Sequence, residues 1–269
     1  MLIVAKIGGS ILKQETSPDL ISDIKNVLSG NRVVLVHGGG VEVSEVASKM
    51  GKAQEFVVSP EGFSSRYTDK ETIEIYTMAM VGKINKQIVC ALQSQDIPAV
   101  GLSGLDGRLV QAKRKEKLIV VDPRGRKKVV DGGYTGKISG VNANLLQVLL
   151  QSGYVPVVAP VAIGEQSEPL NIDGDRAAAY IAGSLKADRL ILLTDVEGLI
   201  LNGKVVPKLN VLEAKDSLPK IGRGMITKVN AAAEALSMGV GEVLISSGLA
   251  KFPISSPLKH ECGTVISRE

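Results

Sequence analysis

Two glycine-rich turns near the start of the chain combine residue types that can bind an anion. KIGGS at residues 6–10 closes an apolar run at 3–7, and HGGG at 37–40 follows the next one at 32–36. Successive glycines let backbone N–H groups approach a phosphate or carboxylate, and a helix that begins there adds its own N–H groups. Tight turns also need glycine. Two such turns after neighbouring strands, one with a lysine, favour phosphate or carboxylate binding.

Four further segments place charged or polar residues beside the start of a helix or the end of a strand: SRYTD at 65–69, NIDGD at 171–175, TDVEG at 194–198 and GRGMITK at 222–228. Each also has an ordinary interpretation. Arg66 could be a surface arginine and Lys228 a solvated helix lysine, while Asp175 could be a first-turn charge that the helix dipole favours.

The sequence lacks the common nucleotide-binding fingerprints. No G-x-x-x-x-G-K-S/T motif occurs; the nearest stretch begins at Asp131 and ends at Ile138, where a magnesium-binding hydroxyl should stand. No G-x-G-x-x-G is present either. A P-loop enzyme and a Rossmann dehydrogenase are therefore disfavoured.

The composition excludes several other kinds of site. The chain has 269 residues, 44% of them hydrophobic and 22% charged, with two histidines (His37, His260) and two cysteines (Cys90, Cys262). A zinc cluster, a disulfide framework and a protein metal site are not expected; His37 is predicted to be structural and Cys90 to lie in the core. No apolar run is long enough to span a membrane, so we expect a cytoplasmic protein.

Short β-branched runs alternate with helical patterns, which predicts an α/β fold with a mainly parallel sheet. A long helix is expected at 70–95, capped by Thr68 or Asp69, and antiparallel hairpins at 105–138. The polar stretch at 164–169 is the expected lobe boundary. The strands are expected at residues 3–7, 32–36, 97–102, 155–159, 190–193 and 242–245.

The positive charge is concentrated in the hairpin region. Residues 111–128 hold eight basic and two acidic side chains, a local balance of +6 in a chain whose total is +4. A solvated hairpin would explain this, as would a surface for an acidic partner. Nucleic acid is disfavoured because residues 105–137 contain no Phe or Trp and only Tyr134, so stacking platforms are missing.

Taken in order, eight segments resemble the amino-acid kinase family, on its N-acetylglutamate kinase branch: KIGGS, VHGGG, SRYTD, GYVPVVAP, NIDGD, LLTDVEGL, GMITKV and GTVI. The resemblance implies an αβα sandwich of two lobes, residues 1–168 for the acyl substrate and a homodimer interface, and 169–269 for ATP. It also implies ATP- and Mg²⁺-dependent phosphorylation of a carboxylate to an acyl phosphate. A carboxylate is already ionised at neutral pH, so the scarcity of histidine is no obstacle.

The resemblance carries roles onto individual residues. It implies transition-state lysines at Lys6 and Lys228, held by Asp175. The substrate contacts that it implies are Gly39, Gly40, Arg66 and Asn171. Phosphate and ATP contacts would be Gly8, Gly9, Asp195, Gly198, Ile200, Lys220 and Gly222.

Three departures from that branch point to a relative whose substrate is carried by a protein. Tyr67 stands where valine is common, Asp173-Gly174 replaces Asn-Ala, and the hairpin region is basic. These features resemble the kinase that acts on glutamate or 2-aminoadipate linked through the amino group to a small acidic carrier protein in lysine and arginine biosynthesis. An N-acetylglutamate kinase acting on the free metabolite is the alternative, and a non-catalytic nucleotide-binding sensor is disfavoured by the two lysines and Asp175. The residues expected to dock the carrier are Lys113, Arg114, Lys115, Arg126, Lys127 and Lys128.

Overall fold

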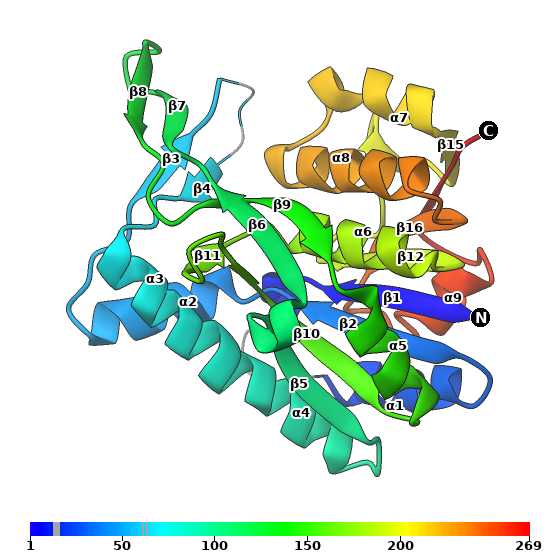
Figure 1. Cartoon of the computed structure of the whole chain (residues 1–269). Coiled ribbons are helices and arrows are strands. Elements are labelled where there is room, and N and C mark those ends of the chain that lie inside the picture. The colour runs from blue at the N-terminus through cyan, green and yellow to red at the C-terminus, as the bar shows by residue number, and fades with distance from the viewer. Residues whose placement is uncertain (13–16, 61, 63) are drawn as a thin grey trace.

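An eleven-stranded, mainly parallel sheet forms the centre of the protein (Figure 1), a computed structural model that describes residues 1–12, 17–60, 62 and 64–269. Parallel ladders join most neighbours, and the antiparallel pairs are β16–β17, β6–β9 and β10–β11. The main path is β15 (Lys208–Asn210), β17 (Thr264–Ser267), β16 (Glu242–Ser247), β12 (Arg189–Thr194), β1 (Leu2–Ile7), β2 (Arg32–His37), β10 (Val155–Ile163), β6 (Val110–Arg114) and β9 (Gly136–Val141), with β5 (Ala99–Gly104) and β11 (Pro169–Asn171) also paired to β10.

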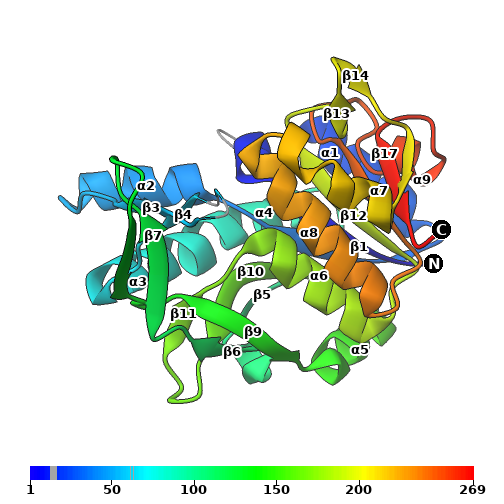
Figure 2. The same ribbon diagram turned by 90° about the horizontal axis from the view of Figure 1, so that it is seen from above.

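Helices cover both faces of this sheet (Figures 1 and 2). Successive strand residues point to opposite faces, so Ile3 and Ala5 join one core cluster while Leu2 and Val4 join the other. The Ile3 side is covered by α1 (Pro18–Leu28), α2 (Gly40–Lys49), α3 (Lys70–Thr77), α4 (Asn85–Gln93) and α9 (Ser255–Leu258). The Leu2 side is covered by α5 (Ala143–Gln151), α6 (Gly174–Leu185), α7 (Val211–Asp216) and α8 (Arg223–Ser237).

The expected α/β class with its large, mainly parallel sheet is confirmed, and all six expected strands are present. The helix expected at 70–95 is also found, as α3 and α4 joined by a π-helical segment, Met78–Ile84. Asp69 caps it by accepting a hydrogen bond from the backbone N–H of Thr72 at 2.7 Å. The prediction for Cys90 is wrong, because this side chain is exposed on α4.

The expected antiparallel hairpins are present as well. β6 pairs with β9, and β7 (Lys117–Val121) pairs with β8 (Lys127–Asp131) in an arm that projects from the body in Figure 1. Beneath it lies a shorter hairpin of β3 (Phe56–Val58) and β4 (Ser64–Arg66). Another short pair is β13 (Ile200–Leu201) with β14 (Lys204–Val205).

The stretch at 164–169 includes the turn between β10 and β11, two strands of the same sheet. The two halves of the chain share one sheet, because β1 of the first half lies between β12 of the second half and β2 of the first. None of the helices in the described residues is long and apolar enough to cross a membrane.

Candidate active site

Lys6, Asp175 and Lys228 meet at the centre of the structure. The Nζ atom of Lys6, near the end of β1, lies 2.8 Å from Oδ1 of Asp175 in the first turn of α6. The Nζ atom of Lys228, on α8, lies 3.2 Å from Oδ2 of the same carboxylate. All three residues are buried, with exposed fractions of 8%, 4% and 9%. The interpretations of Lys228 as a solvated lysine and of Asp175 as only a first-turn charge therefore do not account for these residues.

The contacts within this cluster favour the charged forms of Asp175 and Lys6. Burial acts to raise the pKa of Asp175, but the positive charges of Lys6 and Lys228 outweigh it and hold that pKa below its usual value. Burial acts to lower the pKa of Lys6, but Asp175 outweighs this effect and raises it. Two ammonium groups around one carboxylate leave a net positive charge, which suits an anionic ligand.

The two glycine-rich turns pack against each other beside this cluster. A Cβ atom on Gly9 would lie 2.8 Å from the backbone nitrogen of Gly39, and one on Gly38 would lie 2.8 Å from that of Gly9. Gly39 also has a φ of +149°, and a Cβ there would lie 2.4 Å from Cδ1 of Ile84. Larger residues cannot be accommodated at this contact, so the glycines allow the two turns to pack directly against each other.

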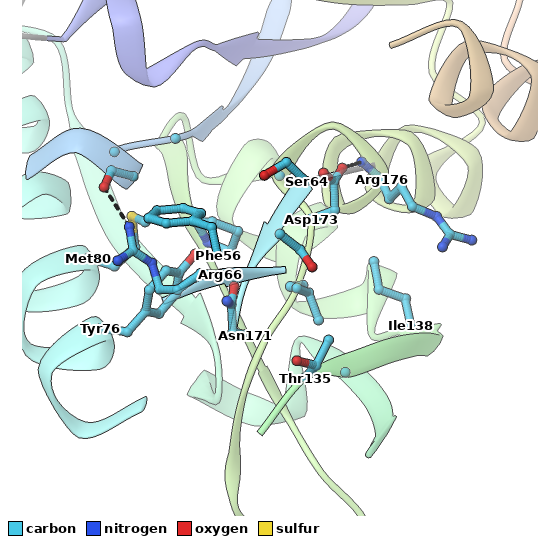
Figure 3. A pocket seen from close by; sticks show the side chains of 18 of the residues that line it. Phe56, Ser64, Arg66, Tyr76, Met80, Thr135, Ile138, Asn171, Asp173 and Arg176 are labelled. Carbon is cyan, nitrogen blue, oxygen red and sulfur yellow. Dashed lines mark hydrogen bonds between the residues drawn. The ribbon is translucent and has the colours of Figure 1, made fainter. Parts of the chain in front are cut away.

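A cavity of about 320 Å³ opens beside Lys6 (Figure 3). It brings together the lysine and the four substrate-binding residues expected from sequence, Lys6, Gly39, Gly40, Arg66 and Asn171, and also Lys115 of the expected docking set. Its other walls include Phe56, Ser64, Tyr76, Met80, Thr135, Ile138, Asp173 and Arg176. Gly8 and Gly9 are not among its lining residues, although Gly9 contacts Gly39 directly.

Arg66 is held inside this cavity and is only 7% exposed, so the surface interpretation is wrong. Its Nη2 donates to the carbonyl oxygen of Gly40 at 2.7 Å and to Oγ of Ser44 at 3.0 Å. Its Nη1 donates to Oε1 of Gln54, and the guanidinium lies 4.9 Å from the centre of the Phe56 ring. These contacts fix the orientation of the guanidinium.

His37 is structural, as predicted. It is fully buried; Nδ1 donates to the carbonyl oxygen of Gly38 at 2.8 Å, and Nε2 accepts from Nδ2 of Asn85 at 3.1 Å. Burial lowers the pKa of His37 to about 4. The imidazole is therefore neutral and supports the turn that carries Gly38.

The residues expected to contact ATP lie outside the lining of this cavity. Asp195 is exposed after β12, where its Oδ1 accepts from Oγ1 of Thr194 at 3.1 Å. Gly198 packs tightly, since a Cβ there would lie 2.7 Å from Oγ1 of Thr264. Ile200 in β13 and Lys220 are exposed, and Gly222 is the N-cap of α8. Their role in nucleotide binding stays a prediction.

The six basic residues expected to dock a carrier have different surroundings. Lys115 is half-buried and lines the cavity, and Arg114 donates to the carbonyl oxygen of Gly133 at 2.6 Å while it lies 4.2 Å from the Tyr134 ring centre. The other four are exposed. Lys113 lies 3.6 Å from Glu165, and Arg126 pairs with Asp122 at 2.9 Å. Lys127 and Lys128 take part in none of the ion pairs found among the described residues.

A second cavity, of about 660 Å³, lies between the β7–β8 arm, the β3–β4 hairpin and α8. It shares five lining residues with the first: Ser64, Ser65, Lys115, Asp173 and Arg176. The first cavity therefore adjoins the space beneath the β7–β8 arm. Sequence reasoning did not find this connection, because it depends on how the arm folds over α8.

The analysis of the sequence also missed Asp173 and Arg176 as cavity residues. Asp173 caps α6, and its side chain lines the cavity. Crowding by protein atoms, followed by the negative charge of Asp175, raises the pKa of Asp173. Arg176 forms two contacts with Glu234 of α8, at 3.0 and 2.6 Å. The NIDGD motif was the available signal for Asp173, but Arg176 had none.

The profile of the amino acid kinase family matches residues 1–247. The chain therefore belongs to the amino acid kinase family. A protein from Sulfolobus acidocaldarius named LysW-aminoadipate/LysW-glutamate kinase is 47% identical over 266 residues, which is 98% of this chain and 100% of that protein. The protein of the same name from Metallosphaera sedula is 47% identical over 268 residues, 99% of this chain and 100% of its own.

Solved structures agree with this membership. The crystal structure of smu.665 from Streptococcus mutans matches with a TM-score of 0.79 and 27% identity, over 100% of this chain and 99% of that one. Carbamate kinase from Giardia lamblia bound to AMP-PNP matches with a TM-score of 0.69 and 18% identity, over 100% and 98%. At that identity the second likeness concerns the fold alone.

Proposed function

We propose that the protein is an ATP-dependent kinase that phosphorylates the side-chain carboxylate of 2-aminoadipate and glutamate while their amino group is linked to an acidic carrier protein. The observation that carries the reaction type is the cluster of Lys6, Asp175 and Lys228 beside a cavity that also holds Arg66 and two glycine turns. The full-length relatives, whose names specify LysW-linked substrates, support the choice of substrate.

The cluster fits the charge requirements of acyl-phosphate formation. The ionised substrate carboxylate attacks the γ-phosphorus of ATP, and ADP leaves, so no proton has to be removed from the nucleophile. Two anions must approach, however, and the ammonium groups of Lys6 and Lys228 would offset their repulsion as charge shifts to the leaving phosphate. The backbone N–H groups of Gly8, Gly9, Gly39 and Gly40 would add donors on the other side.

Magnesium would reach the site with the nucleotide. Mg²⁺ is usually held by phosphate oxygens, water and one or two carboxylates, and the carboxylate of Asp173, which lines the cavity, fits that donor set. When bound, the ion offsets negative charge on the phosphates. Asp195, Gly198, Ile200, Lys220 and Gly222 would bind the remainder of ATP.

The family resemblance is the basis for assigning the acyl substrate and ATP to the two halves of the chain. Residues 1–168 would hold the acyl substrate and pair with a second copy in a homodimer, and residues 169–269 would hold ATP. Lys6 comes from the first half, whereas Asp175 and Lys228 come from the second. The transferred group would therefore lie where the halves meet in the continuous sheet.

The carrier would approach along the basic arm. The exposed Lys127 and Lys128 can attract an acidic protein surface, while the second cavity leads from beneath the arm to Lys115 and the acyl site. A free acetylated amino acid needs no such surface beyond its pocket. The arm therefore supports the carrier-linked substrate over the free metabolite.

A hydroxylamine-trapping assay tests the proposed function. Wild-type protein with ATP and Mg²⁺ is expected to form hydroxamate from carrier-linked glutamate and carrier-linked aminoadipate, with kcat/KM at least tenfold higher than for free N-acetylglutamate. Omission of ATP is the control. Activity confined to free N-acetylglutamate would replace the proposal with an N-acetylglutamate kinase.

Charge reversal on the arm tests the docking surface. The double variant Lys127→Glu/Lys128→Glu is expected to raise KM for carrier-linked substrate about tenfold at low salt, with KM for ATP unchanged, because it repels an acidic partner. The difference should shrink as ionic strength rises. Lys25→Glu/Lys259→Glu, which reverses two exposed lysines elsewhere, is the matched control. Equal KM values for the two double variants across the salt series would contradict the docking assignment.

A further inference from the structure

Tyr76 presents an unused hydroxyl to the acyl cavity. It lies in α3, is 6% exposed and lines the cavity beside Arg66 and Asn171 (Figure 3). Its hydroxyl takes part in none of the hydrogen bonds found among the described residues. The hydroxyl is also not one of the fully buried polar atoms that lack a partner, so it is accessible from the cavity that Tyr76 lines, where a bound ligand can accept its hydrogen bond.

The surroundings of Tyr76 keep this hydroxyl a donor. Burial is the main cause that raises the pKa of Tyr76 far above its usual value, and the charges of Arg66 and Asp173 are close enough to act on it as well. The phenol is therefore neutral at neutral pH. Tyr76 lines the same cavity as Arg66, the residue that is proposed to pair the non-reacting carboxylate of the substrate.

The neighbouring donors leave that carboxylate incompletely satisfied. Both N–H groups on Nη2 of Arg66 and one on Nη1 are already used by protein acceptors, which leaves Nε and one N–H on Nη1. One N–H of Asn171 is directed to Oγ1 of Thr68 at 3.0 Å. A carboxylate offers roughly four acceptor positions, so a further donor from the cavity wall would complete its coordination.

We propose that Tyr76 binds substrate by donating a hydrogen bond from its phenol to the non-reacting carboxylate that Arg66 pairs. This inference rests on the proposed function, and it adds a substrate contact that neither the resemblance nor the relatives' names assign. The contact would be the same in the ground state and the transition state, since it is made away from the reacting carboxylate. It should therefore govern KM and leave kcat nearly unchanged.

The test is Tyr76→Phe, which removes the hydroxyl and keeps the ring. A hydrogen bond to a charged group corresponds to about a 10- to 100-fold change in affinity. We expect KM for the acyl substrate to rise by that factor, with kcat within about twofold and KM for ATP unchanged. Tm should not fall, because the removed hydroxyl has no partner in the unliganded protein. Tyr154→Phe, at an exposed tyrosine, is the matched control.

Assays with three acyl substrates distinguish a failure of this inference from a failure of the proposed function. The substrates are carrier-linked glutamate, carrier-linked aminoadipate and free N-acetylglutamate, and all three carry the non-reacting carboxylate. If wild type accepts only the free metabolite, the proposed function fails, yet Tyr76→Phe should still raise its KM. An unchanged KM for an accepted substrate overturns the inference alone. A lower Tm with parallel losses in kcat and in ATP binding would assign Tyr76 a structural role, and wild type inactive with all three would overturn both.

Discussion

Replacing Lys6 with alanine is expected to lower kcat for acyl-phosphate formation about 10²- to 10³-fold. The Lys6 ammonium is buried, charged and fixed 2.8 Å from Oδ1 of Asp175 beside the acyl cavity. A preorganised donor of this kind stabilises charge that develops during transfer, and the loss of one such donor costs about this factor. KM for either substrate should change less than kcat, because the contact is strongest in the transition state.

Single-turnover and steady-state measurements on Lys6→Ala with saturating ATP and acyl substrate would check this result. Lys228→Ala should give a loss of similar size, because its ammonium holds the other oxygen of the same carboxylate at 3.2 Å. Lys25→Ala removes an exposed lysine from α1 and should leave kcat unchanged. A Lys6→Ala variant with wild-type kcat would remove Lys6 from the catalytic machinery.

Asp175→Asn is expected to impair both the reaction and the fold. The change removes the carboxylate that contacts both ammonium groups and leaves two buried positive charges without this counterion. Breaking a buried ion pair in this way lowers the free energy of unfolding by about 3–5 kcal/mol. We also expect kcat to fall at least 10²-fold, because Lys6 and Lys228 lose the group that positions them.

Denaturant unfolding at several pH values would separate this effect from a general loss of packing. The folded-state pKa of Asp175 is lowered, so its stabilisation is present above the unfolded value near 4 and is lost as pH falls through the folded pKa. The pKa of Lys6 is raised, so its share is complete below an unfolded value of about 10.4 and is lost as pH rises through the folded pKa. The difference in unfolding free energy between wild type and Asp175→Asn should therefore be present at neutral pH and should narrow in strong acid.

Asp96→Asn is the matched control. Asp96 is an exposed loop residue, and its carboxylate takes part in none of the ion pairs found among the described residues. Its unfolding free energy should follow wild type at every pH. An Asp175→Asn protein as stable as Asp96→Asn would contradict the account of the buried cluster.

Most elements of the fold could be predicted because their signals are local. The apolar run at residues 3–7 is buried on both sides, as β-branched runs in parallel sheets are, and the polar residue Asp69 marks the start of the long helix by capping it. The turn of the basic arm was equally readable: Asp122 accepts backbone hydrogen bonds from Arg124 and Arg126, as aspartate does at a turn.

The predictions of side-chain burial were wrong where the local sequence pattern did not show which segments would cover the residue. Cys90 was expected in the core, but it lies two residues beyond Ile88, and that step on a helix turns a side chain to nearly the opposite face. The π-helical segment before it had no sequence signal. Arg66 and Lys228 had plausible surface interpretations, because burial depends on the segments that cover a side chain and not on its own type.

The sequence by itself determined the chemistry that is available: lysines, carboxylates and glycine turns at the ends of strands, and a concentration of positive charge in residues 111–128. Only the tertiary structure decided which of these groups act together. Lys6, Asp175 and Lys228 are far apart in the chain and meet because β1, α6 and α8 converge at the middle of one sheet. Long-range packing also covers Arg66 and Tyr76 with protein and places their cavity beside the β7–β8 arm, because burial, charge separation and the shape of a cavity depend on segments far apart in the chain.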